Sequence, residues 1–321
     1  MSFLSTAVQQ VLTDGPFCAV AASTPRGPHC TPLVFAYSGG RVWLTTSRGS
    51  VKTRAWKVDP GVAGMVRDGD LTVTFTGTVK TYDALNRGTW GAAVAGATSI
   101  ARATGTFSKK NARFFAGYAF DARQVPLAWT PPGRVFVGID LERTALLDED
   151  GVQEGRGRWG GEAVSHATFR QRKQGTDPLA ALPSDVAAAL GRSGEGALTI
   201  AGARGPVVLP VRWLADEHSL YAALPAESLA LAGAGPDAAV SLTVDHASEW
   251  RARDMTGSMV QGEGAFYVLR SVGSGSKTAG AIATGLHPGA DALVRITPSR
   301  LVWWKGWSSG SAATGDAPPA A

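Results

Sequence analysis

The clearest pattern in the first half of the chain is an alternation of β-forming runs with short turns. In 71–76, Leu71, Val73 and Phe75 alternate with threonines, which is the period of a strand with one buried face. Further runs rich in β-branched and aromatic residues occur at 17–23, 30–37, 42–44, 61–66, 71–82 and 134–147. Several short strands at this spacing predict a barrel or a sandwich.

Helices are expected at fewer places. A short one is predicted at 3–12, and a second begins after Ser50, a natural N-cap, and ends at Asp59-Pro60. The Ala-rich segment 84–104 and a helix from Ser108 to Phe120 are expected to cover the sheet. A helical piece is also predicted at 184–190.

The second half of the chain repeats the first at an offset of about 178 residues. The tripeptide Arg26-Gly27-Pro28 recurs as Arg204-Gly205-Pro206. At the same offset Pro32 matches Pro210, Phe35 matches Trp213, Trp43 matches Tyr221 and Ser50 matches Ser228; with shifted offsets, Gly77 matches Gly262, 137–139 matches 294–296 and Arg143 matches Arg300. We therefore expect two copies of one β-rich α+β domain, at 1–150 and 196–308. A linker at 151–195 and a disordered tail at 309–321 complete the expected organisation.

One stretch, 41–57, has the composition of an anion site. A strand leads into Thr45, Thr46, Ser47 and Arg48, and then into the Ser50-capped helix that carries Lys52. Backbone N–H groups and the positive end of a helix dipole attract anions, although a capped helix with a solvated basic face is the ordinary alternative. The second copy has Ala223, Leu224, Ala226 and Ala230 at the corresponding positions. This loss of donors favours an anion site in the first copy only.

Composition narrows the range of ligands. The 321 residues carry 31 cationic and 26 anionic side chains, a net charge of +5 that suits an acidic small molecule and does not require nucleic acid. The two cysteines need no pairing at this size, so a cytoplasmic location is expected. Neither a signal peptide nor a membrane-spanning run is predicted. The five histidines lack metal-ligand spacing, so no metal site is expected.

The first copy resembles the pyridoxamine 5'-phosphate oxidase-like family, the FMN-binding split β-barrels. The resemblance rests on the element Thr46-Ser47-Arg48-Gly49-Ser50-Val51-Lys52, which is similar to the family's phosphate-gripping motif, and on the flanking strand 29–35. It implies two tandem split β-barrels that form within one chain the pair that the family forms as a dimer, with inserted helices in the first barrel. The chain itself is expected to be a monomer or a homodimer.

The resemblance also implies a cofactor site between the barrels. Its residues in the first copy are Thr31, Thr45, Thr46, Ser47, Arg48, Ser50 and Lys52, with Thr72 on a neighbouring strand. From the second copy, Trp304 and Trp307 are candidates to contact a flat ring, since alternation places Trp303 and Trp304 on opposite faces.

The implied function is that of an FMN-dependent oxidoreductase acting on a small organic substrate. The strand 29–36 lacks the basic residues of the true oxidases, which indicates a substrate other than pyridoxamine phosphate. The deazaflavin F420 is the alternative cofactor, with Arg48, Arg54 and Lys57 available for its acidic tail. A non-catalytic flavin- or haem-binding protein is the alternative of another class. Because a flavin carries hydride chemistry itself, no catalytic side chain is named. No membrane partner is expected.

Overall fold

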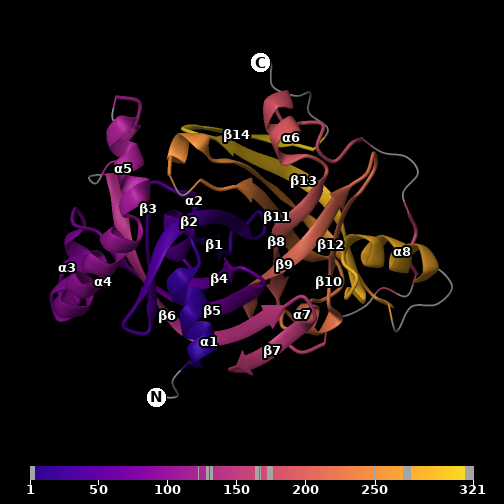
Figure 1. The fold of residues 1–321 in the computed structure, drawn as a ribbon, viewed down its shortest axis with the longest axis horizontal. Coiled ribbons are helices and arrows are strands. Elements are labelled where there is room, and N and C mark those ends of the chain that lie inside the picture. Colours follow the sequence, from indigo (N-terminus) through magenta and orange to yellow (C-terminus); the bar gives the residue numbers. More distant parts are fainter. Residues whose placement is uncertain are drawn as a thin grey trace.

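The chain folds into two closed β-barrels that lie side by side (Figure 1). The computed structural model describes residues 4–121, 123–127, 130, 133–162, 166, 168–171, 176–248, 250–269 and 276–314. In the first barrel the strands follow the order β3-β2-β1-β4-β5-β6, β3 pairs with β6 to close the ring, and β7 extends β6. The second barrel repeats this order as β10-β9-β8-β11-β12-β13, with β14 added to β13. The prediction of two tandem barrels is confirmed.

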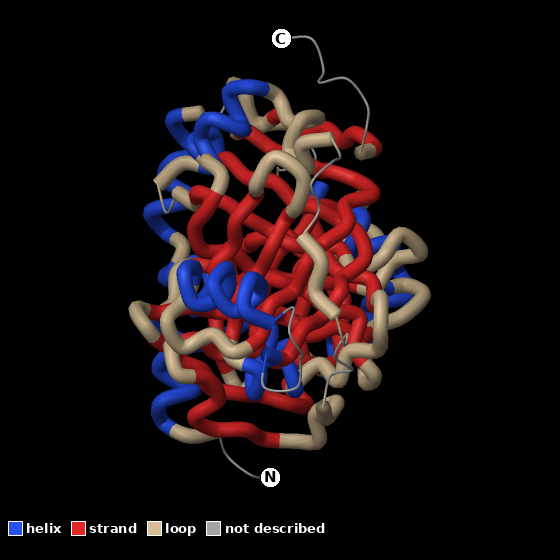
Figure 2. Tube along the Cα trace, turned by 90° about the vertical axis from the view of Figure 1, so that its right-hand side faces the viewer, coloured by secondary structure: helices blue, strands red, loops and turns tan. Residues whose placement is uncertain are grey.

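The elements of the first barrel are α1 (Thr6–Asp14), β1 (Phe17–Ala22), β2 (His29–Ser38), β3 (Arg41–Ser47), α2 (Val51–Trp56), β4 (Gly61–Asp68), β5 (Leu71–Tyr82), α3 (Trp90–Ala95), α4 (Ala97–Lys110), α5 (Ala112–Phe120), β6 (Arg134–Asp148) and β7 (Gly151–Arg156). Those that follow are α6 (Ser184–Leu190), β8 (Ser193–Gly202), β9 (Gly205–Ala215), β10 (Leu220–Leu224), α7 (Ala226–Ala230), β11 (Ala238–His246), β12 (Thr256–Val268), α8 (Ser276–Leu286), β13 (Ala292–Lys305) and β14 (Ser308–Ala313). Strands occupy the centre of the molecule and helices lie around them (Figure 2).

Strand register confirms the internal repeat. In the closing pair of the first barrel Trp43 lies opposite Gly138, and in the second barrel Tyr221 lies opposite Arg295, at the positions that the sequence matched. Each barrel also has a bulge at the same point, immediately before Gly77 in β5 and before Gly262 in β12. Both barrels therefore share one hydrogen-bonding pattern as well as one strand order.

The two bulge glycines are required by backbone contact. A Cβ on Gly77 would lie 2.1 Å from the carbonyl oxygen of Asp140, and a Cβ on Gly262 would lie 2.0 Å from that of Thr297. A bulge brings the neighbouring backbone this close, so only a residue without a side chain fits.

Three sequence-based boundaries are wrong. Ser108 does not begin a helix, because α4 continues through it to Lys110 and α5 follows at Ala112. The expected linker contains β7, which pairs with β6, so the first sheet continues beyond residue 150. The expected disordered tail begins with β14, which pairs with β13. The strand β7 is rich in glycine and charged residues, and β14 is rich in serine and alanine. Both therefore lack the apolar pattern that identifies the barrel strands.

Each barrel has its own apolar interior. The two barrels are joined along a seam by hydrogen bonds and by contacts between small apolar side chains. Thr74 donates a hydrogen bond to the carbonyl of Val208 at 2.5 Å, and Thr243 donates to the carbonyl of Cys30 at 3.0 Å. The small side chains of Ala21 and Ala63 pack in the same cluster as Val208. Small residues and buried hydroxyl groups thus let the barrels approach closely. Among the described residues, no helix has the length and apolar character needed to cross a membrane.

Candidate functional site

The turn between β3 and α2 gathers a network of hydroxyl groups. Thr46 Oγ1 donates to Ser50 Oγ at 3.2 Å, and Ser50 Oγ lies 2.9 Å from Thr53 Oγ1. Ser50 caps α2 as predicted, because its hydroxyl accepts from the backbone N–H of Thr53 at 3.1 Å. Thr53 in turn donates to the carbonyl of Ser47 at 2.8 Å. The network places several donors at one turn of the first barrel.

Lys52, on the first turn of α2, is buried and directed at β2, where its ammonium group donates a hydrogen bond to Thr31. Burial lowers the pKa of Lys52 to about 8, and the nearby Cys30 and Cys18 oppose this shift. Within the described part of the chain, no carboxylate forms an ion pair with the Lys52 ammonium. His29 does not supply a second charge, because burial, together with Lys52 and Arg300, lowers its pKa to about 3.

The burial of Lys52 is costly unless an anion joins it. A cation transferred into a protein interior loses its hydration, and it is normally found there with a partner of opposite charge. On the sequence alone, part of the attraction for an anion is expected to come from the dipole of α2. The helix has only six residues, fewer than two turns, so its aligned dipoles contribute little. Lys52 and the hydroxyl groups are therefore the principal anion-attracting groups here.

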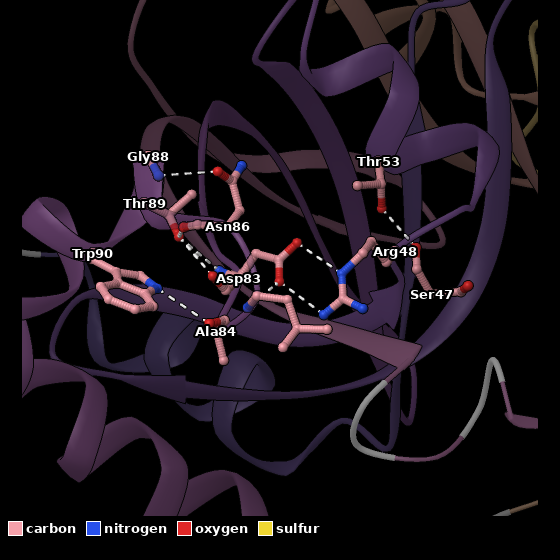
Figure 3. A network of polar contacts seen from close by, with 10 residues as sticks. Ser47, Arg48, Thr53, Asp83, Ala84, Asn86, Gly88, Thr89 and Trp90 are labelled. Carbon is pink, nitrogen blue, oxygen red and sulfur yellow. Dashed lines mark hydrogen bonds and ion pairs between the residues drawn. The ribbon is translucent and has the colours of Figure 1, made fainter.

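Arg48 pairs with Asp83, the residue that follows β5 (Figure 3). Its Nε and Nη2 donate to the two carboxylate oxygens of Asp83, each at 2.8 Å. This bond lowers the pKa of Asp83, although burial opposes the shift. The backbone of Asp83 is also joined to Thr89, whose hydroxyl donates to its carbonyl at 2.9 Å. Arg48 thus fixes the β3–α2 turn to the start of the helical insert.

A cavity of about 810 Å³ lies between the outer face of the first barrel and the helices α3 to α5. Its lining is mostly aromatic and aliphatic, with a few polar groups among them. Thr45 and Val34 belong to the barrel side of the cavity, and Tyr118 to the helical side. A volume of this size accommodates a small organic molecule or part of a cofactor.

Arg134, the first residue of β6, is the main polar group on the barrel side of the cavity. Its Nε and Nη2 donate to Thr45 Oγ1 at 3.0 and 2.8 Å, and Nη2 also donates to the Thr45 carbonyl at 2.7 Å. Burial lowers the pKa of the Arg134 guanidinium, with the phenol of Tyr118 opposing this shift. Thr45 is therefore held by Arg134, and both groups face the helical insert.

The structure brings together only part of the predicted site. Thr31 and Lys52 meet directly, and Thr46 and Ser50 share the hydroxyl network, with Ser47 contributing its carbonyl. Thr45 and Arg48 lie toward the helical insert instead.

The three most distant candidates differ from one another. Thr72 lines a separate small pocket of about 80 Å³ together with Pro225 and Ser228 of the second barrel. Trp304 lies over Gly257, where an added Cβ would meet its ring at 2.2 Å. Trp307 crosses the seam and meets Tyr118 edge-to-face, with ring centroids 5.5 Å apart. Trp307 thus contacts Tyr118, one of the residues that line the cavity. Cofactor contacts by all of these residues remain predictions.

The second barrel lacks the corresponding arrangement. Its helix α7 begins directly after β10, with Pro225 at the N-cap position and no side-chain cap. Ser228, which the sequence matched to the cap Ser50, lies inside this helix and is buried. The hydroxyl-rich turn therefore has no counterpart, so donors are lost through a shorter connection as well as through the substitutions.

Sequence reasoning missed Asp83, Arg134 and Tyr118. Asp83 follows directly on β5, and Arg134 is the first residue of β6. Charged residues at strand ends are common at surfaces, so neither position alone indicates a site. Their importance arises from the strand order, because β3 pairs with β6, which in turn pairs with β5.

Comparisons with known proteins found likenesses among solved structures. No family profile matches the sequence, and no curated protein matches it significantly. Similar structures include a FAD-binding protein from Mesorhizobium loti, with 19% identity over 44% of this chain and 94% of that chain and a TM-score of 0.33. An F420 reductase has 19% identity over 44% of this chain and 98% of that chain, with a TM-score of 0.30. A pyridoxamine 5'-phosphate oxidase-related, FMN-binding protein from Nostoc punctiforme has 14% identity over 48% of this chain and 90% of that chain, with a TM-score of 0.33. At these identities and scores the likenesses assign neither a family nor a cofactor to this chain.

Proposed function

We propose that this chain is an FMN-dependent oxidoreductase that binds its cofactor at the first barrel, with the phosphate at Lys52. The observation that carries the proposal is the buried ammonium of Lys52, which donates to Thr31 and has no carboxylate partner among the described residues. A phosphate is the kind of partner that makes such a group stable, because a charge-assisted hydrogen bond contributes about 1.5–3 kcal/mol.

The surrounding donors fit a phosphate and a polyhydroxylated chain. Ser50 and Thr46 carry hydroxyl groups at the same turn, and each is able to donate or accept when the network rearranges. Thr31 offers a further hydroxyl on β2. When bound, a flavin supplies two-electron chemistry, and the side chains of this protein bind it, orient it and restrict access of water.

The proposal assigns one site to each chain. The second barrel has a shorter connection from β10 to α7, with Pro225 at the N-cap and Ala230 at the position matched to Lys52. The small pocket that Pro225 and Ser228 help to line contains the carboxylates of Asp70, Asp148, Glu149 and Glu195 and the guanidinium groups of Arg67 and Arg212. Carboxylates outnumber cations there, which disfavours a phosphate. The second barrel therefore acts as a wall of the site in the first.

Absorbance of the purified protein and titration of the cofactor-free protein test this proposal. We expect the purified protein to show a flavin spectrum and to release the flavin into solution on heating. We also expect the cofactor-free protein to quench FMN fluorescence on titration. Lys52→Met is expected to weaken FMN binding at least tenfold, whereas Lys57→Met, an exposed change at the end of the same helix, should leave it unaltered. Selective binding of F420 would show that the cofactor is the deazaflavin and not FMN. A haem spectrum without flavin binding would overturn the proposal.

A further inference from the structure

The two barrels carry helical insertions at the same place in the strand order. The insertions differ in how closely their helices pack against the barrel. The connection from β5 to β6 contains α3, α4 and α5, and the connection from β12 to β13 contains α8. The two insertions lie on opposite flanks of the molecule (Figure 1). In the second barrel, Tyr221 and Tyr267 pack directly against Ala279 and Ala283 of α8, and all four are buried. That barrel thus shows how this insertion closes when it serves packing alone.

In the first barrel the corresponding space is a cavity. Trp43 occupies the position that matches Tyr221 and stacks on Phe136, with ring centroids 5.1 Å apart, and on Tyr82 at 5.9 Å. The helices touch this aromatic layer through Phe107 and leave a cavity of about 810 Å³ beside it. Protein interiors are normally close-packed, so a large apolar cavity beside a packed counterpart indicates a binding space.

Aromatic side chains form a large part of the walls on the helical side. Those contributed by α3, α4 and α5 are Trp90, Phe107, Phe114, Phe115 and Tyr118. Phe107 meets Phe136 edge-to-face at 5.8 Å, and Phe114 meets Tyr118 in the same way at 5.4 Å. Rings arranged in this manner offer faces and edges to a further ring, which favours a flat or cyclic ligand.

A small polar group lies within this apolar lining. Arg134 carries a positive charge, and the neighbouring carboxylate of Asp83 is already neutralised by Arg48. Burial raises the pKa of Tyr118, with Arg134 opposing the shift, so the phenol is protonated at neutral pH. Arg134 is therefore a cationic group in the described lining, and its guanidinium favours a ligand with an acidic or carbonyl oxygen.

Two aromatic residues of the lining reach the protein surface. Trp90 and Phe115 line the cavity and remain 50% and 39% exposed, respectively. Leu85 and Val94, on the same insertion, are also exposed. Large apolar side chains seldom gather at a surface without a binding role. These exposed side chains add apolar surface to the insertion that covers the cavity.

We propose that the cavity under α3 to α5 is the substrate site of this protein, and that it takes an apolar, ring-containing molecule with one acidic or carbonyl oxygen. This proposal rests on the proposed function, to which it adds the class of substrate. Thr45 connects the two regions, because it lines the cavity beneath Arg134 and directly precedes Thr46 of the hydroxyl network.

Two fluorescent probes with one ring system test the proposal on cofactor-free protein. Anilinonaphthalene sulfonate has an aromatic body and an anionic group, and phenylnaphthylamine has the same body without the charge. Both are expected to bind the parent protein. Arg134→Gln should weaken the sulfonate roughly tenfold or more and change phenylnaphthylamine less than about twofold, since only the former loses a charge-assisted bond.

A second pair of variants tests the location. Ala93 lines the cavity and Ala92 is exposed on the same helix. Ala93→Phe fills the space and is expected to weaken both probes at least tenfold, whereas Ala92→Phe should change neither. Unaltered probe affinity in Ala93→Phe would overturn the cavity as the binding site, and equal loss of both probes in Arg134→Gln would overturn the role of Arg134. These readings require no FMN, so they fail independently of the Lys52 titration.

Discussion

Lys52 and Thr31 form a buried hydrogen bond between α2 and β2, and the ammonium group in this bond lacks a carboxylate partner among the described residues. Such a pair is poorly explained as a device for stability, because a neutral side chain of similar length would fill the space without the loss of hydration. The arrangement is consistent with a group retained to bind an anion. Opposite effects on stability and on binding are therefore expected when the charge is removed.

Lys52→Met is predicted to stabilise the cofactor-free protein while it impairs cofactor binding. Burial lowers the pKa of Lys52 from 10.5 to about 8, a shift that corresponds to a cost on the order of 3 kcal/mol at neutral pH. Removal of the charge should recover part of this cost and raise Tm by a few degrees. Thermal unfolding of the cofactor-free variant and parent measures the effect. A lower Tm would identify Lys52 as a structural residue, and Lys57→Met provides the exposed control.

Cofactor affinity is predicted to decrease above pH 8. The free protein loses the Lys52 proton as the pH rises through its pKa of about 8, whereas the phosphate complex requires the protonated form. A phosphate monoester also loses charge below its second pKa of about 6, so affinity should be greatest between these values. FMN titrations from below pH 6 to above pH 8 should show a dissociation constant that rises at alkaline pH by up to tenfold for each pH unit. The alkaline rise should be absent in Lys52→Met; its persistence there would assign the effect to another group.

The bulge glycines are predicted to be intolerant of any side chain. In Gly77→Ala the new methyl group would meet the Asp140 carbonyl at 2.1 Å, and backbone movement in a barrel strand is costly. We expect a loss of roughly 1–3 kcal/mol in the free energy of unfolding. Gly105→Ala, on α4, meets nothing within 4 Å and is expected to gain about 0.5–1 kcal/mol. Denaturant unfolding of both variants measures the contrast, and equal stabilities would refute the assigned register.

Asp83→Asn is predicted to loosen the helical insert. The Arg48 hydrogen bonds hold the pKa of Asp83 below its usual range, so their stabilising effect is present above the carboxyl's unfolded pKa. The effect is lost as pH falls through the lower folded-state value. The protection factors of amides in 84–120, corrected for the intrinsic pH dependence of exchange, should therefore be lower in the variant than in the parent at neutral pH. In the parent they should also be lower in acid than at neutral pH. Asp70→Asn, on an exposed turn, is the matched control, and equal protection in both variants would contradict the assigned role of Asp83.

Much of the fold follows from the sequence because the repeat fixes the strand register. The match of Trp43 with Tyr221 and of 137–139 with 294–296 places equivalent residues opposite each other in both closing pairs. The two strands added at the ends of the sheets, β7 and β14, were not predictable from the repeat. The strands β7 and β14 are held by pairing with one neighbour, and their polar sequences lack the alternation that a buried face imposes.

The candidate site was predictable only where its residues are close in sequence. Thr46, Ser50 and Lys52 lie in one motif, and the structure keeps them at one turn. Arg48 belongs to the same motif, but its partner Asp83 comes from another strand, and the sequence gives no sign of their bond. The helical cavity was also not anticipated, because its size depends on how far α3 to α5 stand from the barrel.

The most direct test of the central claim is the stoichiometry of FMN binding, measured by calorimetric titration of cofactor-free protein. We expect one FMN per chain in the parent protein and in Lys57→Met, with binding weakened at least tenfold in Lys52→Met. Two FMN molecules per chain would show that the second barrel retains a site. Unchanged affinity in Lys52→Met, or the absence of FMN binding, would contradict the assignment of the phosphate to the first barrel.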